Sequence, residues 1–156
     1  MNIEKSDPHR AGKGGTFVGS YLLYLLAAAS DKASAQFHAR VRESGLRVPE
    51  WRVLACLVDN ENMMITELAE LSLMEQSRMT RIVEQMDAKG LVRRVSDPRD
   101  RRRVRVQLTD EGRQRAEVLV AEAHAHEDAL LSALADTDAA RIKPVLQALL
   151  ARLDQR

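Results

Sequence analysis

Residues 90–112 concentrate side chains that are well suited to binding phosphate. The stretch from residue 89 to residue 113 holds 9 basic and 4 acidic side chains, a net charge of +5, whereas the whole chain carries only +1. Arginine presents a planar fork of donors that matches phosphate oxygens. Because a basic segment in a balanced chain indicates a footprint for a polyanion, we expect this segment to bind nucleic acid. The alternative is a solvated hairpin that is rich in arginine.

A two-stranded hairpin is the element that would present these arginines. Residues 104–108 alternate apolar and polar side chains, which is the period of a half-buried strand. Asp97 and Pro98 indicate a loop between this strand and one that begins after Gly90. Thr109 is a suitable N-cap for the helix that follows. We therefore expect a strand, a basic loop, a second strand and a capped helix.

The hairpin directly follows a predicted helix-turn-helix. We expect a helix from Pro49 in its first turn to about residue 59, a short helix over 66–71, and a third over about 73–89. Ser72 stands three residues before Glu75, which is the spacing of a capping box, so Ser72 is predicted to cap the third helix. The buried stripe of the third helix would consist of Met79, Ile82, Val83 and Met86.

Long apolar helices flank this part of the chain. Residues 17–44 read as one helix that ends at Gly45, and its first half is apolar nearly all round. We expect a helix from Thr109 to about residue 134, and a last one, capped by Asp136 or Asp138, that ends near residue 153. A small domain rarely buries such helices alone, so a second copy of the chain is expected to cover them.

The predicted fold is therefore mainly α, a winged helix-turn-helix flanked by N- and C-terminal dimerisation helices. Residues 1–16 would form a flexible lead and residues 17–156 a single domain. Within that domain we expect dimerisation helices at about 17–45 and 114–156, with the winged helix-turn-helix at about 48–112.

The chain shows no sign of secretion or membrane insertion. Its single cysteine, Cys56, excludes an intrachain disulfide and favours the cytoplasm. The apolar run over residues 17–29 follows basic residues like a signal peptide, but it is too short to span a bilayer. Its apolar pattern also continues at helical spacing. Because Cys56 stands among apolar residues, an inert packed thiol is the better interpretation than a redox sensor.

Neither a metal site nor a catalytic site is indicated. His124 and His126 are two residues apart, so they do not share a helix face, and together with Glu127 they read as solvated surface. The chain lacks the sequence motifs of α/β-hydrolases, P-loop proteins and zinc proteases. We expect no enzyme, no cofactor and no bound metal. Two other classes stay open, namely a winged-helix module that binds protein and an architectural DNA-binding protein without an effector.

Several stretches resemble the MarR family of bacterial transcription regulators. The strongest are residues 90–94 (GLVRR), 97–102 (DPRDRR) and 108–112 (LTDEG), with weaker support from 51–54 (WRVL) and 67–69 (ELA). The resemblance implies an obligate homodimer with a triangular, mainly α fold that binds a pseudo-palindromic operator. It also implies modulation by a small molecule, and repression by steric block of a promoter is the more usual outcome in the family.

The resemblance makes the helix at about 73–89 the recognition helix, whose first turns meet base edges. The residues expected to lie there against DNA are Gln76, Ser77, Arg78, Thr80 and Arg81. Arg78 can present two parallel donors to a guanine, although the family more often has a small polar residue nearby, which leaves a phosphate contact open. The alternative for Arg78 and Arg81 is a surface pair with Glu75, Glu84 or Gln85.

The resemblance also assigns roles in the hairpin. Arg99 or Arg101 at its tip would enter the minor groove, while Asp97 and Asp100 would brace the loop by pairing with Arg102. Phosphate contacts, which position a protein without reading sequence, are expected from Arg94, Arg103 and Arg105.

An effector pocket in this family lies between the dimerisation helices and the DNA-binding lobe. The residues of this chain at matching positions are Tyr24, Phe37, His38, Arg40, Trp51 and Arg52. Aromatic rings beside cations suit a phenolic carboxylate or its thioester. The alternative is that Tyr24, Phe37 and Trp51 belong to the core and that the two arginines are ion-paired.

Overall fold

The computed structural model describes residues 16–96, 100 and 103–155. The chain divides into two compact units, residues 1–35 and residues 36–156, which are described separately. The predicted flexible lead falls almost entirely outside the described residues. Within the described part of the chain, no helix is both long enough and apolar enough to cross a membrane.

The first unit contains α1 (Phe17–Ser20) and most of α2 (Leu22–Glu43), which continues into the second unit. The predicted single helix over residues 17–44 is wrong at Tyr21, whose extended backbone (φ −75°, ψ 117°) separates the two helices. Thr16 caps α1 by accepting a hydrogen bond from the backbone of Gly19, and the rings of Phe17 and Tyr21 stack with centroids 5.1 Å apart. The apolar pattern could not reveal the break because it runs through both helices.

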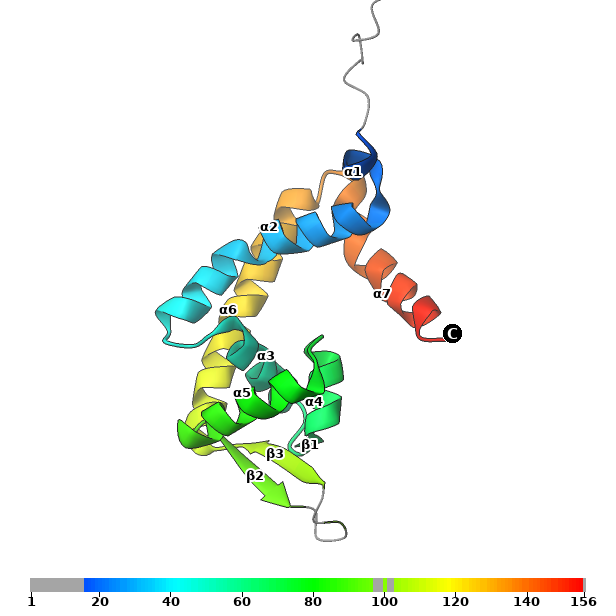
Figure 1. The fold of residues 1–156 in the computed structure, drawn as a ribbon. Coiled ribbons are helices and arrows are strands. Elements are labelled where there is room, and N and C mark those ends of the chain that lie inside the picture. The colour runs from blue at the N-terminus through cyan, green and yellow to red at the C-terminus, as the bar shows by residue number, and fades with distance from the viewer. Residues whose placement is uncertain (1–15, 97–99, 101–102, 156) are drawn as a thin grey trace, which may run out of the picture. The chain divides into compact units, whose positions relative to one another are not determined.

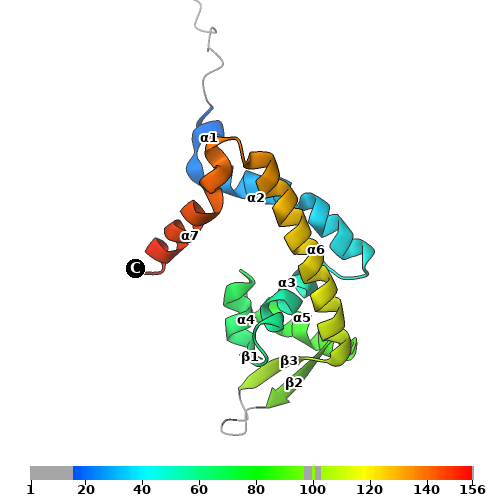
Figure 2. The same cartoon turned by 180° about the vertical axis from the view of Figure 1, so that it is seen from behind.

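The second unit carries the remaining elements in the predicted order (Figure 1). They are α3 (Val48–Val58), β1 (Met63–Met64), α4 (Ile65–Leu71), α5 (Gln76–Ala88), β2 (Val92–Ser96), β3 (Val104–Leu108), α6 (Asp110–Leu134), the 3-10 helix η1 (Asp138–Arg141) and α7 (Ile142–Leu153). Helix α6 runs along α3, with the β2–β3 hairpin at its N-terminal end and α7 beyond its C-terminal end (Figure 2). This is the predicted mainly α, winged helix-turn-helix architecture.

A three-stranded antiparallel sheet forms the wing, in the order β1-β3-β2. In the β2–β3 hairpin, Val92 pairs with Leu108 and Ser96 pairs with Val104. On the other side of β3, Met63 of β1 pairs with Val106. The sequence analysis missed β1, because two residues are too few to show a strand period.

One core holds the winged helix-turn-helix together. The predicted stripe of α5, Met79, Ile82, Val83 and Met86, is buried. These side chains pack with Val53, Leu54 and Leu57 of α3, Leu68 of α4, Val106 of β3, and Ala116 and Leu119 of α6. Because α3, α4, α5, α6 and the strands of the wing all bury apolar side chains in this one core, the core fixes how these elements are arranged.

The junction between the wing and α6 agrees with the predicted cap. Thr109 accepts a hydrogen bond from the backbone N–H of Gly112 at 3.0 Å. A Cβ on Gly112 would lie 1.8 Å from the carbonyl oxygen of Leu91, so only glycine permits this approach of α6 to the start of the hairpin. Gly90 has a φ of +72° and follows α5, where the sequence predicts its end.

The predicted start of the third helix is wrong. Helix α5 begins at Gln76, and Glu75 is the N-cap and makes no side-chain capping bond. Ser72 is instead the buried C-cap residue of α4, with its Oγ 3.8 Å from the Sγ of Cys56. The physical reason is the turn itself, since Leu73 adopts a left-handed φ of 54° and four residues, 72–75, lie between the end of α4 and the start of α5.

The predicted cap of the last helix is also wrong. Neither Asp136 nor Asp138 caps it; the side chain of Thr137 accepts from the backbone of Ala139 at 3.2 Å and starts η1. Helix α7 follows with Arg141 at its N-cap and ends at Leu153, close to the expected end. The threonine hydroxyl takes the capping role, which places Asp138 one position later, in the first turn.

Candidate nucleic-acid interface

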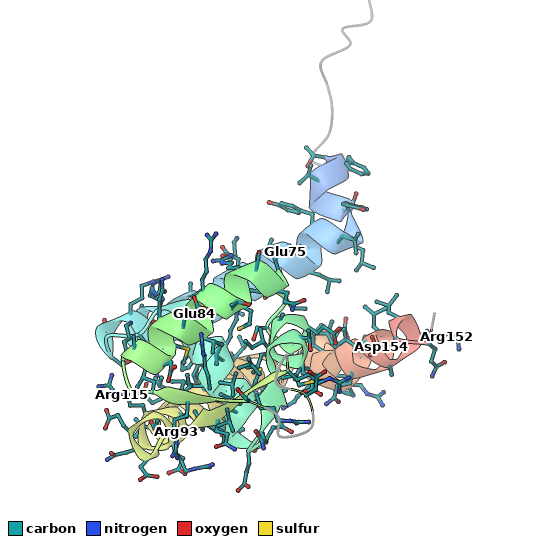
Figure 3. The ribbon with its side chains drawn as sticks, turned by 60° about the horizontal axis from the view of Figure 1, so that its bottom comes forward. Glu75, Glu84, Arg93, Arg115, Arg152 and Asp154 are labelled. Carbon is teal, nitrogen blue, oxygen red and sulfur yellow. The ribbon has the colours of Figure 1, made fainter. Side chains whose placement is uncertain are left out.

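The exposed face of α5 carries the predicted DNA-binding side chains. Because Met79, Ile82, Val83 and Met86 face the core, the helical period turns the opposite face of α5 outward. Gln76, Ser77, Arg78 and Arg81 are exposed, and Thr80 is half-buried with its hydroxyl donating to the backbone oxygen of Gln76 at 3.0 Å. In Figure 3, Glu75 and Glu84 mark two places along this helix, and Arg93 lies below on the adjacent strand β2.

The two arginines of α5 are available for a ligand. Among the described residues, neither Arg78 nor Arg81 makes an ion pair or a side-chain hydrogen bond. Two of the alternative partners named above are engaged elsewhere, since Glu84 accepts from Arg94 at 3.1 Å and Gln85 accepts from Arg47. The first two turns of α5 therefore present unpaired cations beside amide and hydroxyl groups.

The described arginines of the wing differ in what they contact. Arg94, predicted to bind phosphate, lies against α5, with Glu84 at 3.1 Å and Asp87 at 3.8 Å. In this arrangement it braces the hairpin against the helix. Arg103 is exposed and pairs with Asp100 at 3.6 Å. Arg105 is half-buried and donates to the backbone oxygen of Asn62 at 3.5 Å.

Part of the predicted wing tip lies outside the described residues. It comprises Asp97, Arg99, Arg101 and Arg102. The predicted minor-groove contacts and the predicted pairing of Asp97 and Asp100 with Arg102 therefore stay predictions.

A cleft of about 310 Å³ lies between α5, the start of α4 and the wing. It is lined by Met64, Ile65, Thr66, Gln76, Thr80, Arg103 and Val104. Hydroxyl, amide and guanidinium groups converge there, and these groups commonly contact the DNA backbone. The structure thus adds Thr66 to the candidate interface. The sequence analysis did not single out this threonine, because only the pairing of β1 with β3 brings the start of α4 beside the wing.

A buried charge lies where the C-terminal end of α5 meets the N-terminal end of α3. We call Arg47, Glu50, Gln85 and Lys89 the corner cluster. The fully buried carboxylate of Glu50 accepts hydrogen bonds from the backbone N–H of Arg47 at 2.8 Å, from its guanidinium at 2.9 Å, and from Lys89 Nζ at 2.7 Å. Burial alone would raise the pKa of this carboxyl, but the hydrogen bonds from Arg47 and Lys89 outweigh burial and lower the pKa to about 2.

Three of the six predicted effector-binding residues, Phe37, His38 and Trp51, form one group of rings in the second unit. Phe37 is buried, with its ring 5.1 Å from that of Trp51 and 6.1 Å from that of His126. The ring of His38 lies 6.5 Å from that of Phe37. Phe37 and the half-buried Trp51 therefore belong to the core and its edge, as the alternative interpretation has it.

The other three predicted effector residues have separate surroundings. Arg52 donates to the backbone oxygen of Ser72 at 3.3 Å, and Arg40 is exposed on α2. Tyr24 lies in the first unit and is exposed. A groove of about 390 Å³ in the second unit is lined by other residues: Ser44, Leu46, Glu111, Gln114, Arg115, Val118, Leu119 and Glu122. The predicted solvated surface holds for His124, which is exposed, but not for His126 and Glu127, which are half-buried. The ring of His126 packs against that of Phe37, and Glu127 pairs with Lys143 at 2.9 Å.

Comparison with known proteins places these features in a family. The sequence model of the MarR family matches residues 46–104, which hold α3, β1, α4, α5, β2 and the first residue of β3. A solved MarR family transcriptional regulator from Silicibacter pomeroyi DSS-3 is 73% identical, with a TM-score of 0.84 over 89% of this chain and 99% of that chain. A solved structure of BpsR from Bordetella bronchiseptica, described as a mechanism for regulation of DNA binding by 6-hydroxynicotinic acid, is 25% identical, with a TM-score of 0.73 over 92% of this chain and 99% of that chain.

A curated relative points the same way. The HTH-type transcriptional repressor IacR from Pseudomonas putida is 32% identical over 94 residues, which are 60% of this chain. The matched stretch spans 56% of that repressor, so the chain aligns with little more than half of its length.

Proposed function

This chain belongs to the MarR family of transcriptional regulators, and on that premise we propose that it binds a pseudo-palindromic DNA operator as a homodimer. A regulator of this kind acts by binding and not by catalysis. The observation that carries the proposal is the pair Arg78 and Arg81, which make no ion pair with any described residue and lie on the exposed face of α5 beside the arginine-rich wing. Such a helix fits the major groove, while a basic wing follows the phosphates.

A homodimer is supported by apolar side chains that the single chain leaves exposed. Helix α7 buries no residue, and Val145, Leu150 and Leu153 are exposed on it. Phe17, Leu22 and Leu23 are exposed in the first unit. Apolar surface of this extent usually marks an interface. A two-fold dimer would carry two copies of α5 to half-sites one helical turn apart, about 10 bp from centre to centre.

Repression by steric block of a promoter is the mode of action that we propose. The Pseudomonas putida relative is named as a repressor. A dimer that covers an operator in the bacterial cytoplasm needs no further activity to exclude a polymerase. The predicted contacts of Gln76, Ser77, Thr80, Arg94, Arg99, Arg101, Arg103 and Arg105 are part of this proposal, and Thr66 joins them.

An effector of the aromatic carboxylate class, or its thioester, is proposed to modulate operator binding. DNA binding by the Bordetella relative is regulated by 6-hydroxynicotinic acid, which belongs to that class. In this chain Arg40 of α2 and Arg52 of α3 are exposed, and the rings of Phe37 and Trp51 on the same two helices lie 5.1 Å apart. This part of the proposal is tested by adding each of a panel of aromatic carboxylates to the complex and measuring release of the bound operator.

Selection of bound sequences from a random DNA pool by the purified chain tests the function as a whole. The expected result is an enriched inverted repeat with half-sites one helical turn apart, bound with a steep dependence on salt. Failure to enrich any sequence, by a folded dimer and without added ligand, would contradict operator binding and favour an architectural or protein-binding role.

A further inference from the structure

The corner cluster attaches the C-terminal end of α5 to the N-terminal end of α3 at two points. Lys89, the C-cap residue of α5, donates to the carboxylate of Glu50 at 2.7 Å. Arg47, the N-cap residue of α3, donates to the same carboxylate and also to the side-chain oxygen of Gln85 one turn earlier in α5. Glu50 is therefore the central acceptor between the two helices. Its donor on α5, Lys89, stands 39 positions after it in the sequence.

A buried carboxylate fixes a helix more strictly than apolar packing does. Apolar side chains tolerate small sliding movements, because their attraction has no direction. If α5 turned or shifted, Glu50 would lose donors while still excluded from water, and an unpaired buried charge is costly. At the opposite end of α5, Glu75 makes no side-chain capping hydrogen bond within the described chain.

The direction of α5 decides where its exposed arginines point. Arg78 lies about three turns from Lys89 along the same helix, so a small change of angle at the attached end moves its guanidinium by a larger distance. A bidentate contact with a base tolerates little displacement.

We propose that Glu50 is a positioning residue for operator recognition, which sets, through Lys89 and Arg47, the angle at which α5 presents Arg78 and Arg81 to DNA. The inference rests on the proposed function, because it takes α5 as the helix that reads the operator. Glu50 itself does not touch DNA, since its carboxylate is fully buried.

Glu50→Met in the full chain is the decisive variant. Methionine has a similar volume and needs no partner, and the side chains of Arg47 and Lys89 are 54% and 47% exposed and can stay hydrated, so the fold should be kept. The expected result is a loss of operator affinity of about tenfold or more, the value of one bidentate base contact. Affinity for random-sequence DNA should change by less than about twofold, because phosphate contacts carry it.

Two further variants separate positioning from a structural effect. Glu50→Gln keeps the shape and removes the charge, and it should lower operator affinity in the same direction as Glu50→Met. Glu111→Gln is the matched control, because Glu111 pairs at 2.7 Å with Arg115 on the same helix and joins no two elements. This control should leave both DNA affinities unchanged.

Amide hydrogen exchange without DNA measures the attachment directly. The backbone N–H groups of Lys89, Gly90 and Leu91 donate to carbonyls of α5 at 3.1, 2.9 and 3.0 Å. In Glu50→Met these amides should exchange about tenfold faster or more, with exchange in α3 beyond its first turn little changed. Some loss of global stability is expected in either case, so the distribution of exchange decides: a purely structural role of Glu50 would raise exchange to a similar extent throughout the winged helix-turn-helix.

Unchanged operator affinity in a folded Glu50→Met protein would overturn the positioning role, and unchanged exchange at residues 89–91 would overturn the attachment. A wild-type protein that selects no DNA sequence would overturn the proposed function and, with it, the recognition part of this inference. The exchange measurement would in that case still support or overturn the attachment of α5 by Glu50.

Discussion

The winged-helix region, residues 46–108, and the C-terminal helix α7 use the same apolar residue types in opposite ways. Leu54 in α3 is 0% exposed and belongs to a core shared by helices and strands. Leu150 in α7 is 60% exposed, and α7 buries no residue. The winged-helix region therefore carries its own stabilising contacts, whereas α7 has an apolar face that only another surface can bury.

Within the winged-helix region, charged groups divide into those that are paired inside it and those that are left exposed. In the winged-helix region the buried Glu50 has three hydrogen-bond donors, and Arg94 lies between Glu84 and Asp87. Among the described residues of the region, Arg78 and Arg81 on α5 and Arg93 on β2 are exposed and make neither an ion pair nor a side-chain hydrogen bond. Cations without a partner on two adjoining elements indicate where we expect a polyanion to bind.

Replacing the same side chain in the two regions gives the largest expected effect. Leu54→Ala should lower the free energy of unfolding by about 2–5 kcal/mol, because it leaves a cavity in a packed core. Leu150→Ala should change the unfolding of the winged-helix region little and should instead weaken the dimer. Urea unfolding followed at several protein concentrations, with sedimentation to measure the dimer dissociation constant, distinguishes the two. If the chain is a monomer and both variants lose the same free energy of unfolding, the contrast between the two regions is wrong.

The pH dependence of stability tests whether the internal charge of the winged-helix region is stabilising. Glu50 has a pKa lowered from 4.5 to about 2 in the folded chain, so its ionised form stabilises the fold at neutral pH by about 3 kcal/mol. This contribution is present above pH 4.5 and is lost as the pH falls toward 2. Glu50→Gln should be less stable than the wild type at pH 7, and the difference should shrink over that window. A difference in unfolding free energy that stays constant from pH 7 to pH 2 would contradict the assignment.

Arg78→Ala sharpens the comparison at the exposed face. The variant should lose about 1–3 kcal/mol of operator binding and relax the preference at one base pair, since a bidentate contact with guanine is removed. Its stability should not change, because Arg78 makes no ion pair within the described chain. Binding measured on the selected operator and on single-base variants checks this. An equal loss on all sequences would show that Arg78 contacts phosphate.

Much of the winged-helix region could be predicted because its signals are local. Three of these signals depend only on residues a few positions apart in the sequence. They are the buried stripe of α5, the alternation in β3 and the capping hydroxyl of Thr109. The exposed placement of Arg78 and Arg81 follows from that stripe. The same reasoning found the exposed apolar face of α7, although no pattern within one chain shows what covers it.

The features that could not be predicted depend on contacts between distant segments or on backbone geometry. Strand β1 exists because Met63 pairs with Val106, and Thr66 joins the interface for the same reason. Arg94 faces α5 only because the hairpin folds back onto that helix. Ser72 and Glu75 have the spacing of a capping box, yet the left-handed turn at Leu73 places Ser72 at the end of α4.

That turn is the one described place where the winged-helix region keeps backbone strain, and it gives the smallest predicted effect. Leu73 has a φ of 54° and is 86% exposed, so its side chain packs on little while its backbone occupies a region that favours glycine. Leu73→Gly should raise the free energy of unfolding by about 0.5–1 kcal/mol, because relief of strain exceeds the added freedom of the unfolded chain.

Leu71→Gly is the control for this variant. Leu71 is also exposed, at 61%, but it is the last residue of α4 and has ordinary helical geometry. The same change there should lower the free energy of unfolding by about 0.5–1 kcal/mol, since glycine only adds freedom to the unfolded chain. If urea unfolding shows that both variants are destabilised, the side chain of Leu73 must be buried against a partner in solution. The winged-helix region would then depend on a second surface, as α7 does.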